Sequence, residues 1–187
     1  LGYGGGVGAL KKFGADKLGL NEEQLQGLVD KWRAASPAIT GLWRACEQAA
    51  KNAIRCPGKT YKARRSSKAN KPGSAVCAYV RDRDALRLTL PSKRQLSYWG
   101  AWLDDKEGSI RFWRLNQATR KWEKSETYGG RLVENVIQAF ARDVLAEAML
   151  RLEQAGHEIV FSVHDEVIVE APEGSQVAFT VPILWMR

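Results

Sequence analysis

The sequence predicts an α+β fold, and three features of its apolar pattern support that class. Apolar residues at helical spacing fill most of the stretch from Asn21 to Cys56, and short runs with a period of two follow between Tyr79 and Trp122. A long helical stripe then precedes two short apolar runs. Helices and antiparallel strands are therefore expected together in this chain.

The composition is that of a folded globular protein that favours polyanionic partners. Of 187 residues, 44% are hydrophobic and 27% are charged, without the polar bias typical of disordered chains. The 29 Lys and Arg residues outnumber the 21 Asp and Glu residues, which leaves a formal net charge of +8. Such a charge favours nucleic acid or an anionic membrane face as a partner.

The cysteines and the start of the chain narrow the class of protein. Cys46, Cys56 and Cys77 form no CxxC pair and the histidines complete no zinc-ligand spacing, so we expect reduced, mainly buried thiols. No apolar run reaches membrane-spanning length and no signal peptide is visible, which predicts a cytoplasmic protein with no membrane partner. Because the chain starts at Leu1 without a methionine, we expect a piece of a longer protein.

Two amphipathic helices are predicted before residue 57. Asn21, with Gln24 three residues later, has the form of a helix start, and the helix that follows ends near Ala35. Ser36 and Pro37 suit the cap and first position of a second helix, which Cys56-Pro57-Gly58 stops. The expected buried stripe of the second helix consists of Ile39, Leu42, Trp43, Cys46 and Ala50.

Residues 58–75 are basic, rich in Gly, Ser and Pro and almost without apolar residues, which predicts an exposed loop. Two interpretations are open. The loop is a solvated linker, or Arg64, Arg65 and Lys68 contact phosphate groups.

Antiparallel strands are predicted from Tyr79 to Trp122, with alternation over Leu86–Leu90 and a turn at Pro91-Ser92. Five of the seven tryptophans lie between Trp99 and Trp185. At this spacing we expect them to pack in the fold rather than to stack on nucleotide bases.

The strongest helical pattern runs from Arg131 to about Ala155, where Gly156 ends it. Two apolar runs follow, Ile159 to Val163 and Val167 to Val169, with His164-Asp165-Glu166 between them. This pattern predicts a hairpin with carboxylates at its tip. The expected stripe of the helix comprises Leu132, Val133, Val136, Ile137, Phe140, Val144, Leu145, Ala148, Met149 and Leu152.

The acidic tip admits a functional and a structural interpretation. Mg²⁺ prefers oxygen ligands and keeps several waters, so one or two carboxylates and substrate phosphates complete its shell. Asp165 and Glu166 are suited to such an ion. The alternative is a solvated turn without a ligand, since acidic residues are frequent in turns.

Three segments together resemble the family A (DNA polymerase I-like) DNA polymerases of bacteriophage type. Phe161–Val167 matches the conserved segment of that family that ends in Val-His-Asp-Glu. Thr127–Ala139 is similar to the long palm helix that precedes it, and Leu1–Gly5 to the end of the fingers helix, which closes in Tyr-Gly. A flexible glycine linker is the alternative for Leu1–Gly5.

The resemblance implies roles for eight residues. Asp165 would share the catalytic Mg²⁺ ions, with Glu166 and His164 beside the primer end. Tyr3 and Gly4 would lie at the nucleotide insertion site. The palm helix would supply Arg131 as a minor-groove or phosphate contact, Gln138 as a minor-groove donor, and Asn135, which stands one position nearer to that glutamine than in the family.

The resemblance also implies an architecture: a palm sheet with packed helices and part of the fingers. Its expected divisions are residues 1–56 (end of the fingers helix and following helices), 57–126 (basic loop and strands), 127–173 (palm helix and catalytic hairpin) and 174–187, an atypical tail. The segment that bears the other catalytic Asp, and the Arg and Lys that bind triphosphate, would precede residue 1.

The implied activity is nucleotidyl transfer from deoxynucleoside triphosphates to a primer 3′-hydroxyl with two Mg²⁺ ions, in phage or prophage replication in the bacterial host cytoplasm. The implied partners are primer-template DNA and a missing N-terminal part of the polymerase. One alternative is an inactive remnant that binds primer-template DNA. Another is a metal-dependent nuclease, which is disfavoured because no second carboxylate pair occurs at a predicted strand end.

Overall fold

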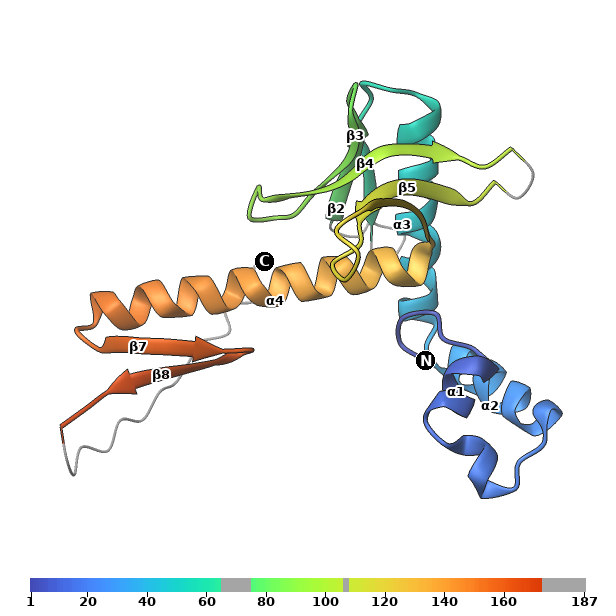
Figure 1. Cartoon of the computed structure of the whole chain (residues 1–187), viewed down its shortest axis with the longest axis horizontal. Helices are drawn as coiled ribbons and strands as arrows, with labels where there is room; N and C mark the ends of the chain where they lie inside the picture. Colours follow the sequence, from blue (N-terminus) through green and yellow to red (C-terminus); the bar gives the residue numbers. More distant parts are fainter. Residues whose placement is uncertain (65–74, 106–107, 173–187) are drawn as a thin grey trace. The chain divides into compact units, whose positions relative to one another are not determined.

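The computed structural model describes residues 1–64, 75–105 and 108–172, arranged in two compact units, Leu1–Val136 and Ile137–Arg187. The mixed helix and strand content confirms the predicted α+β class. The atypical tail, residues 174–187, lies outside the described residues, and the four predicted divisions stay predictions. Figure 1 shows the course of the chain.

The first unit begins with helices. The predicted helices are present as α2 and α3, and α2 starts with a capping box in which Asn21 and Gln24 bond each other's backbone N–H. Ser36 differs from expectation, because its side chain makes no capping hydrogen bond and only Pro37 marks the start of α3. The bounds are α1 Val7–Lys12, the 3₁₀ helix η1 Ala15–Leu18, α2 Glu22–Ala35 and α3 Pro37–Arg55.

A six-stranded antiparallel sheet follows, with its strands paired in chain order (Figure 1). The strands predicted between Tyr79 and Trp122 are confirmed. The loop predicted at 58–75 is wrong at both ends, because β1 pairs there with β2, which begins at Ala75. The rest of that segment, with Arg65 and Lys68, lies outside the described residues. The bounds are β1 Tyr61–Arg64, β2 Ala75–Arg81, β3 Ala85–Thr89, β4 Gln95–Leu103, β5 Ile110–Leu115 and β6 Trp122–Thr127.

Helix α3 packs on one face of this sheet and forms the core of the unit with it. Small residues on α3, among them Cys46, Ala50 and Ala53, are fully buried and allow close approach. The predicted stripe of α3 is wrong at Ile39, which is 40% exposed, whereas Thr40 beside it is buried. Strand residues of the same core are Cys77, Tyr79, Leu86, Leu88 and Tyr98.

The cysteines follow the predicted pattern in part. Cys46 and Cys77 are buried free thiols, but Cys56 is exposed. A hydrogen bond with Cys46, together with burial, raises the pKa of Cys77, so this thiol stays protonated in the core.

The second unit contains most of α4 (Gly129–Gln154) and the hairpin of β7 (Glu158–Val163) and β8 (Glu166–Glu170). Both elements were predicted, and Gly156 ends the helix with a φ of 84°. The hairpin runs back along the C-terminal half of α4 (Figure 1). A register shift between Ile159 and Phe161 places a β-bulge in β7.

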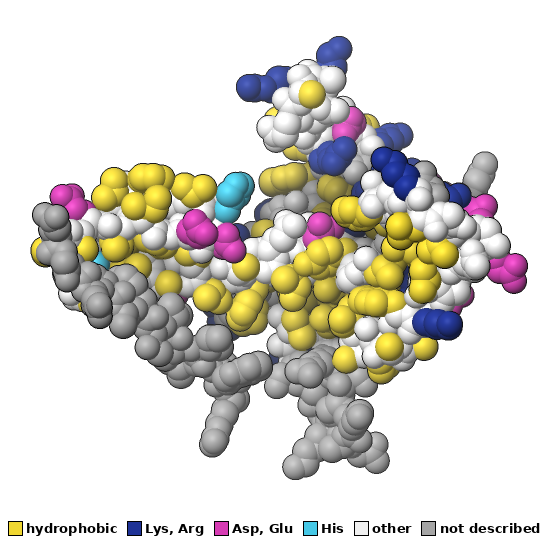
Figure 2. All heavy atoms as spheres, turned by 90° about the horizontal axis from the view of Figure 1, so that it is seen from below, with side chains coloured by type: hydrophobic (Ala, Val, Ile, Leu, Met, Phe, Trp, Pro, Cys, Tyr) yellow, Lys and Arg dark blue, Asp and Glu magenta, His cyan; other side chains and the backbone are white. Residues whose placement is uncertain are grey.

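The second unit exposes many apolar side chains. Among described residues 137–172 only Ala139 is buried, so the predicted stripe of α4 is buried at its N-terminal end but not beyond it. Figure 2 shows hydrophobic side chains at the molecular surface. A surface of this kind is typical of a segment that packs against further polypeptide. The exposed set is Ile137, Phe140, Val144, Leu150, Val160, Phe161, Val163 and Ile168.

No helix in the described part of the chain is both long enough and apolar enough to cross a membrane.

Candidate functional site

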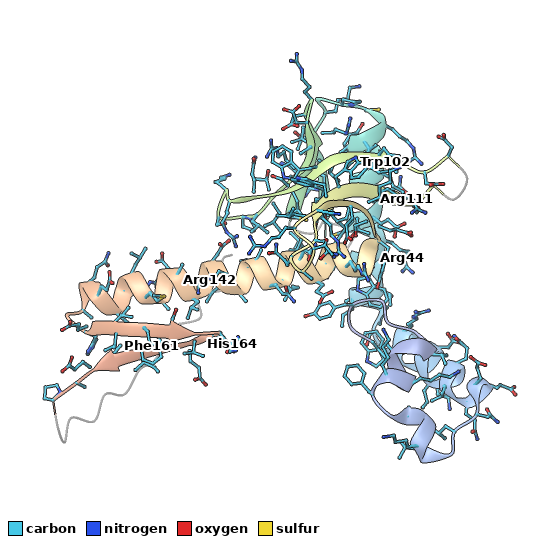
Figure 3. All side chains as sticks on the ribbon, viewed as in Figure 1. Arg44, Trp102, Arg111, Arg142, Phe161 and His164 are labelled. Atoms are coloured by element: carbon cyan, nitrogen blue, oxygen red, sulfur yellow. The ribbon has the colours of Figure 1, made fainter. Side chains whose placement is uncertain are left out.

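The predicted acidic residues lie at the tip of the β7–β8 hairpin. Val163 pairs with Glu166, so His164 and Asp165 form a two-residue turn (Figure 3). His164 has a φ of 53°, a left-handed conformation that favours glycine, and it is the first of the two turn residues. The turn therefore holds an imidazole in a backbone conformation that few side chains other than those of Asn, Asp and His adopt.

The tip is an uncompensated concentration of negative charge. His164, Asp165 and Glu166 are all exposed, and within the described residues neither carboxylate forms an ion pair or a side-chain hydrogen bond. The described residues contain no group of three or more potential metal ligands. Two adjacent carboxylates fit the chemistry of Mg²⁺ but supply only part of a coordination shell.

A second group of predicted residues meets in the first unit, where Tyr3 and Gly4 pack against the start of α4. A side chain at Gly130 would overlap the carbonyl group of Tyr3 and stand 2.8 Å from the backbone nitrogen of Gly4. Gly4 has a φ of 83°, and a Cβ there would be 2.8 Å from the Tyr128 ring. Both positions thus require glycine: Gly130 because no side chain has room there, and Gly4 because of both the lack of room and its left-handed backbone.

Helix α3 fixes this junction through side-chain contacts. Trp43 Nε1 donates to the carbonyl of Gly2 at 3.1 Å. The backbone N–H of Gly129 donates to Glu47 Oε2 at 3.0 Å, and Lys51 pairs with the other carboxylate oxygen at 2.7 Å. Burial opposes ionisation of Glu47, but the bonds from Lys51 and Gly129 outweigh it and lower its pKa.

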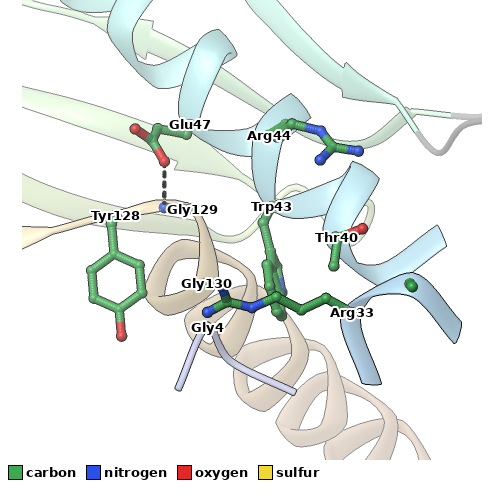
Figure 4. Close-up of a pocket in the computed structure, with 10 residues that line it drawn as sticks. Gly4, Arg33, Thr40, Trp43, Arg44, Glu47, Tyr128, Gly129 and Gly130 are labelled. Atoms are coloured by element: carbon green, nitrogen blue, oxygen red, sulfur yellow. Dashed lines mark hydrogen bonds between the residues drawn. The ribbon is translucent and has the colours of Figure 1, made fainter. Parts of the chain in front are cut away.

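A hollow of about 530 Å³ opens at the same junction (Figure 4). Arg33 reaches across it from α2 and donates to the carbonyl of Gly5 at 3.4 Å. Its lining combines the charged side chains of α2 and α3 with the rings of Trp43 and Tyr128, and it includes the first turn of α4. Its wall consists of Gly4, Arg33, Ala34, Thr40, Trp43, Arg44, Glu47, Tyr128, Gly129 and Gly130.

The three predicted residues of α4 differ in their surroundings. Arg131 is exposed, lies 5.6 Å from the Tyr128 ring centroid and donates to the carbonyl of Glu126 at 3.3 Å. Asn135 is half-buried and donates to Tyr98 Oη at 2.8 Å, and burial raises the pKa of Tyr98 to about 12. Gln138 is exposed.

The structure therefore groups the predicted residues in two places: the hairpin tip in one unit, and Tyr3 and Gly4 against the start of α4 in the other. Sequence reasoning missed Glu47, which accepts from the first N–H of α4. It placed Trp43 only in the buried stripe of the helix and missed the hydrogen bond from Trp43 to Gly2. A signal for the junction existed in the repeated Tyr-Gly-Gly of residues 3–5 and 128–130.

Comparison with known proteins relates the chain to a viral polymerase. It is 36% identical, over 200 aligned positions, to a DNA polymerase of Bacillus phage SP02. The alignment covers the whole of this chain and 28% of that protein, so the chain spans little more than a quarter of its relative's length. No protein-family model matches the chain, and no solved structure matches it either.

The glycine junction generates a stability prediction. Gly130→Ala should lower the melting temperature, because its methyl group has no room beside Tyr3. Gly27→Ala on α2 is the matched control: nothing lies within 4 Å of its Cβ position, and alanine should raise stability by about 0.5–1 kcal/mol. Thermal unfolding followed by circular dichroism checks both. Equal effects of the two substitutions would contradict the close packing.

The carboxylate of Glu47 generates a pH prediction. The pKa of Glu47 is lower in the folded state than its ordinary value of 4.5, so the ionised carboxylate stabilises the fold at any pH above 4.5. This stabilisation is lost as the pH falls from 4.5 through the pKa of the folded state. Glu47→Gln should therefore destabilise the protein at neutral pH and converge with the parent below pH 4.5. Urea unfolding across the pH range measures this, with exposed Glu23→Gln as the control. A difference that persists at low pH would count against the assignment.

Proposed function

We propose that the chain is part of a template-directed DNA polymerase of family A, which transfers deoxynucleotides to a primer 3′-hydroxyl. The observation that carries this proposal is the unpaired Asp165-Glu166 tip on a tight hairpin, in a chain related over its whole length to part of a phage DNA polymerase. In this proposal β7, β8 and α4 belong to the palm, and residues 1–56 to the fingers.

The hairpin tip supports the chemistry through placement and charge. A two-residue turn between paired strands restricts the position of Asp165, which the proposal makes a ligand of Mg²⁺. Mg²⁺ bound there would stabilise the charge that develops on the reacting phosphate and activate the primer hydroxyl. His164 and Glu166 stand on either side of Asp165 and would contact the primer end.

The distribution of charge between the units agrees with this assignment. Residues 1–136 contain 26 Lys and Arg against 13 Asp and Glu, a net charge of +13, whereas residues 137–187 contain 3 against 8, a net charge of −5. The first unit thus favours the phosphate backbone of DNA. The negative charge of the second unit repels phosphate groups. A divalent cation bound at the tip would offset that repulsion and allow a polyanionic substrate to approach.

The other proposed contacts to DNA lie on α4 and at the N-terminal turn. Arg131 and Gln138 are exposed and able to meet a duplex, and Tyr3 is 42% exposed beside the strictly packed Gly4. Asn135 has two ways to contact DNA. It would give up its hydrogen bond to Tyr98, or it would keep that bond and accept a hydrogen bond from DNA with its amide oxygen.

The proposal includes a further polypeptide as a partner. The described ligand set at the tip is incomplete, and the second unit exposes a row of apolar side chains on its hairpin. The rest of a polymerase would supply the remaining carboxylate and the triphosphate-binding cations, and would cover Phe161, Val163 and Ile168. The alternative, a remnant that binds primer-template DNA without extending it, is favoured by the same incomplete ligand set.

The incomplete ligand set predicts that this chain alone does not extend a primer. A primer-extension assay with Mg²⁺ and all four nucleotides tests this, run on the chain alone and with the rest of the related phage polymerase added as a second polypeptide. Extension only in the presence of the added polypeptide would support the proposal. Extension by the chain alone would show that other residues perform the chemistry.

Asp165→Asn in a full-length polymerase should abolish extension but leave primer-template binding within a few fold, because only the metal site loses charge. Asp30→Asn, on the exposed face of α2, is the matched control and should retain both activities. Extension rates and DNA affinities are measured on the same preparations. Near-parental extension by Asp165→Asn would make the ligand assignment wrong.

A further inference from the structure

The sheet of the first unit has a second face, opposite the one that packs on α3, where tryptophans gather. Trp99 on β4 pairs across the strands with Trp113 on β5, and Trp113 pairs with Lys124 on β6. Cross-strand partners point to the same side, so these three side chains form one row. Trp122, two residues before Lys124, lies on the same face.

A β-bulge brings a further ring into this surface, which we call the tryptophan face. The register shifts between Trp99 and Trp102, where Gly100 has a φ of 54° and a Cβ would be 3.0 Å from the Trp113 ring. Trp102 therefore points to the same side as Trp99 although three positions separate them. Its ring centroid is 6.3 Å from that of Trp113 (Figure 3 shows Trp102 on the sheet).

The expectation that these tryptophans serve packing is confirmed only in part, since Trp102 and Trp113 pack against each other but three of the four rings stay well exposed. Trp99, Trp113 and Trp122 are 44%, 39% and 57% exposed, and only Trp102 is half-buried. The part of each ring that stays in water adds nothing to the stability of the chain, and a cluster of such exposed rings marks an interaction site. Trp185 lies outside the described residues.

Cations are interleaved with the rings. The Arg87 guanidinium lies 5.1 Å from the Trp99 centroid, and Lys124 Nζ lies 5.5 Å and 5.9 Å from those of Trp113 and Trp102. Arg87 also pairs with Asp82, and this bond lowers the pKa of that carboxyl to about 2. Lys124, by contrast, forms no ion pair within the described residues, so its charge is available to a ligand.

We infer that the tryptophan face binds single-stranded DNA, with bases stacked on Trp99, Trp113 and Trp122 and the phosphate backbone held by Lys124. Exposed rings beside cations are the chemistry that binds single strands without sequence preference, since every base has a π-face and every nucleotide a phosphate. The net charge of +13 over residues 1–136 is complementary to this ligand. Duplex DNA fits less well, because its bases are already stacked inside the helix.

This site is distinct from the hairpin tip, and it requires neither Mg²⁺ nor triphosphate. On a polymerase it would hold unpaired template or a displaced strand. Its existence does not rest on the proposed polymerase activity, so the two can fail separately.

The test is binding of a fluorescein-labelled oligothymidylate of about 20 nucleotides to the full chain, followed by anisotropy and by tryptophan fluorescence. The oligonucleotide should quench the protein fluorescence. Trp113→Ala and Trp122→Ala should each weaken binding by about fivefold or more, the range measured for loss of one stacked base. Phe13→Ala removes an aromatic ring that is 90% exposed and outside the sheet, and should leave the affinity unchanged.

Lys124→Gln should remove about one phosphate contact, which reduces the slope of log affinity against log salt concentration by ~0.7. Lys31→Gln, an exposed position on α2, should leave that slope unchanged. If Trp113→Ala fails to fold by circular dichroism, the more exposed Trp122 and Lys124 decide the question. Unchanged affinity in both of those variants overturns the inference. A different outcome would equally overturn it: the parent chain self-associates in sedimentation, and the Trp122 and Lys124 variants lose that self-association but keep the parental affinity for oligothymidylate. The face would then be a contact between copies of this chain.

Discussion

The close approach of backbone to backbone at Gly130 is the constraint on which the architecture of the first unit depends. No side chain fits between the start of α4 and the Tyr3–Gly4 turn, so the two segments either meet directly or separate. Glu47 then ties the first N–H of α4 to α3, which in turn forms the core with the sheet. The N-terminal turn, α3, the sheet and the first turn of α4 are thereby joined by a few short contacts, and Asn135 adds another through Tyr98.

Local patterns made much of this fold predictable. Apolar periodicity and the Asn21 capping box depend on neighbours within a few residues, which is why α2, α4 and the hairpin were found close to their true bounds. Strand β1 escaped prediction because its pairing with β2 crosses the basic segment, and its own residues carry almost no apolar signal. Ser36 shows a further limit, since a residue suited to capping need not form the bond.

The hairpin tip and the glycine junction also differ in how far they could be predicted from local sequence. The hairpin tip is contiguous in sequence, so its residues and their turn could be predicted together. The Glu47–Gly129 bond joins residues far apart in the chain, and no local pattern contains it. Alternation along β4 and β5 indicates which tryptophans share a face, but it does not show that this face lies opposite α3. The bulge at Gly100 also interrupts the alternation, so Trp102 lies on a face that simple alternation does not predict. The exposure of Trp113 therefore required the structure.

The left-handed backbone of His164 has a consequence for how the hairpin is understood. A non-glycine residue in that conformation costs on the order of 1 kcal/mol or more, and a glycine at this position would make the tip more stable. Sequence design guided by folding free energy alone would therefore remove the imidazole. Residues that local energetics disfavour tend to mark places where something other than folding determines the sequence. Lys93 and Arg120 share this left-handed conformation, so the backbone angle of His164 agrees with a functional role for the turn that bears Asp165 but does not by itself identify that turn.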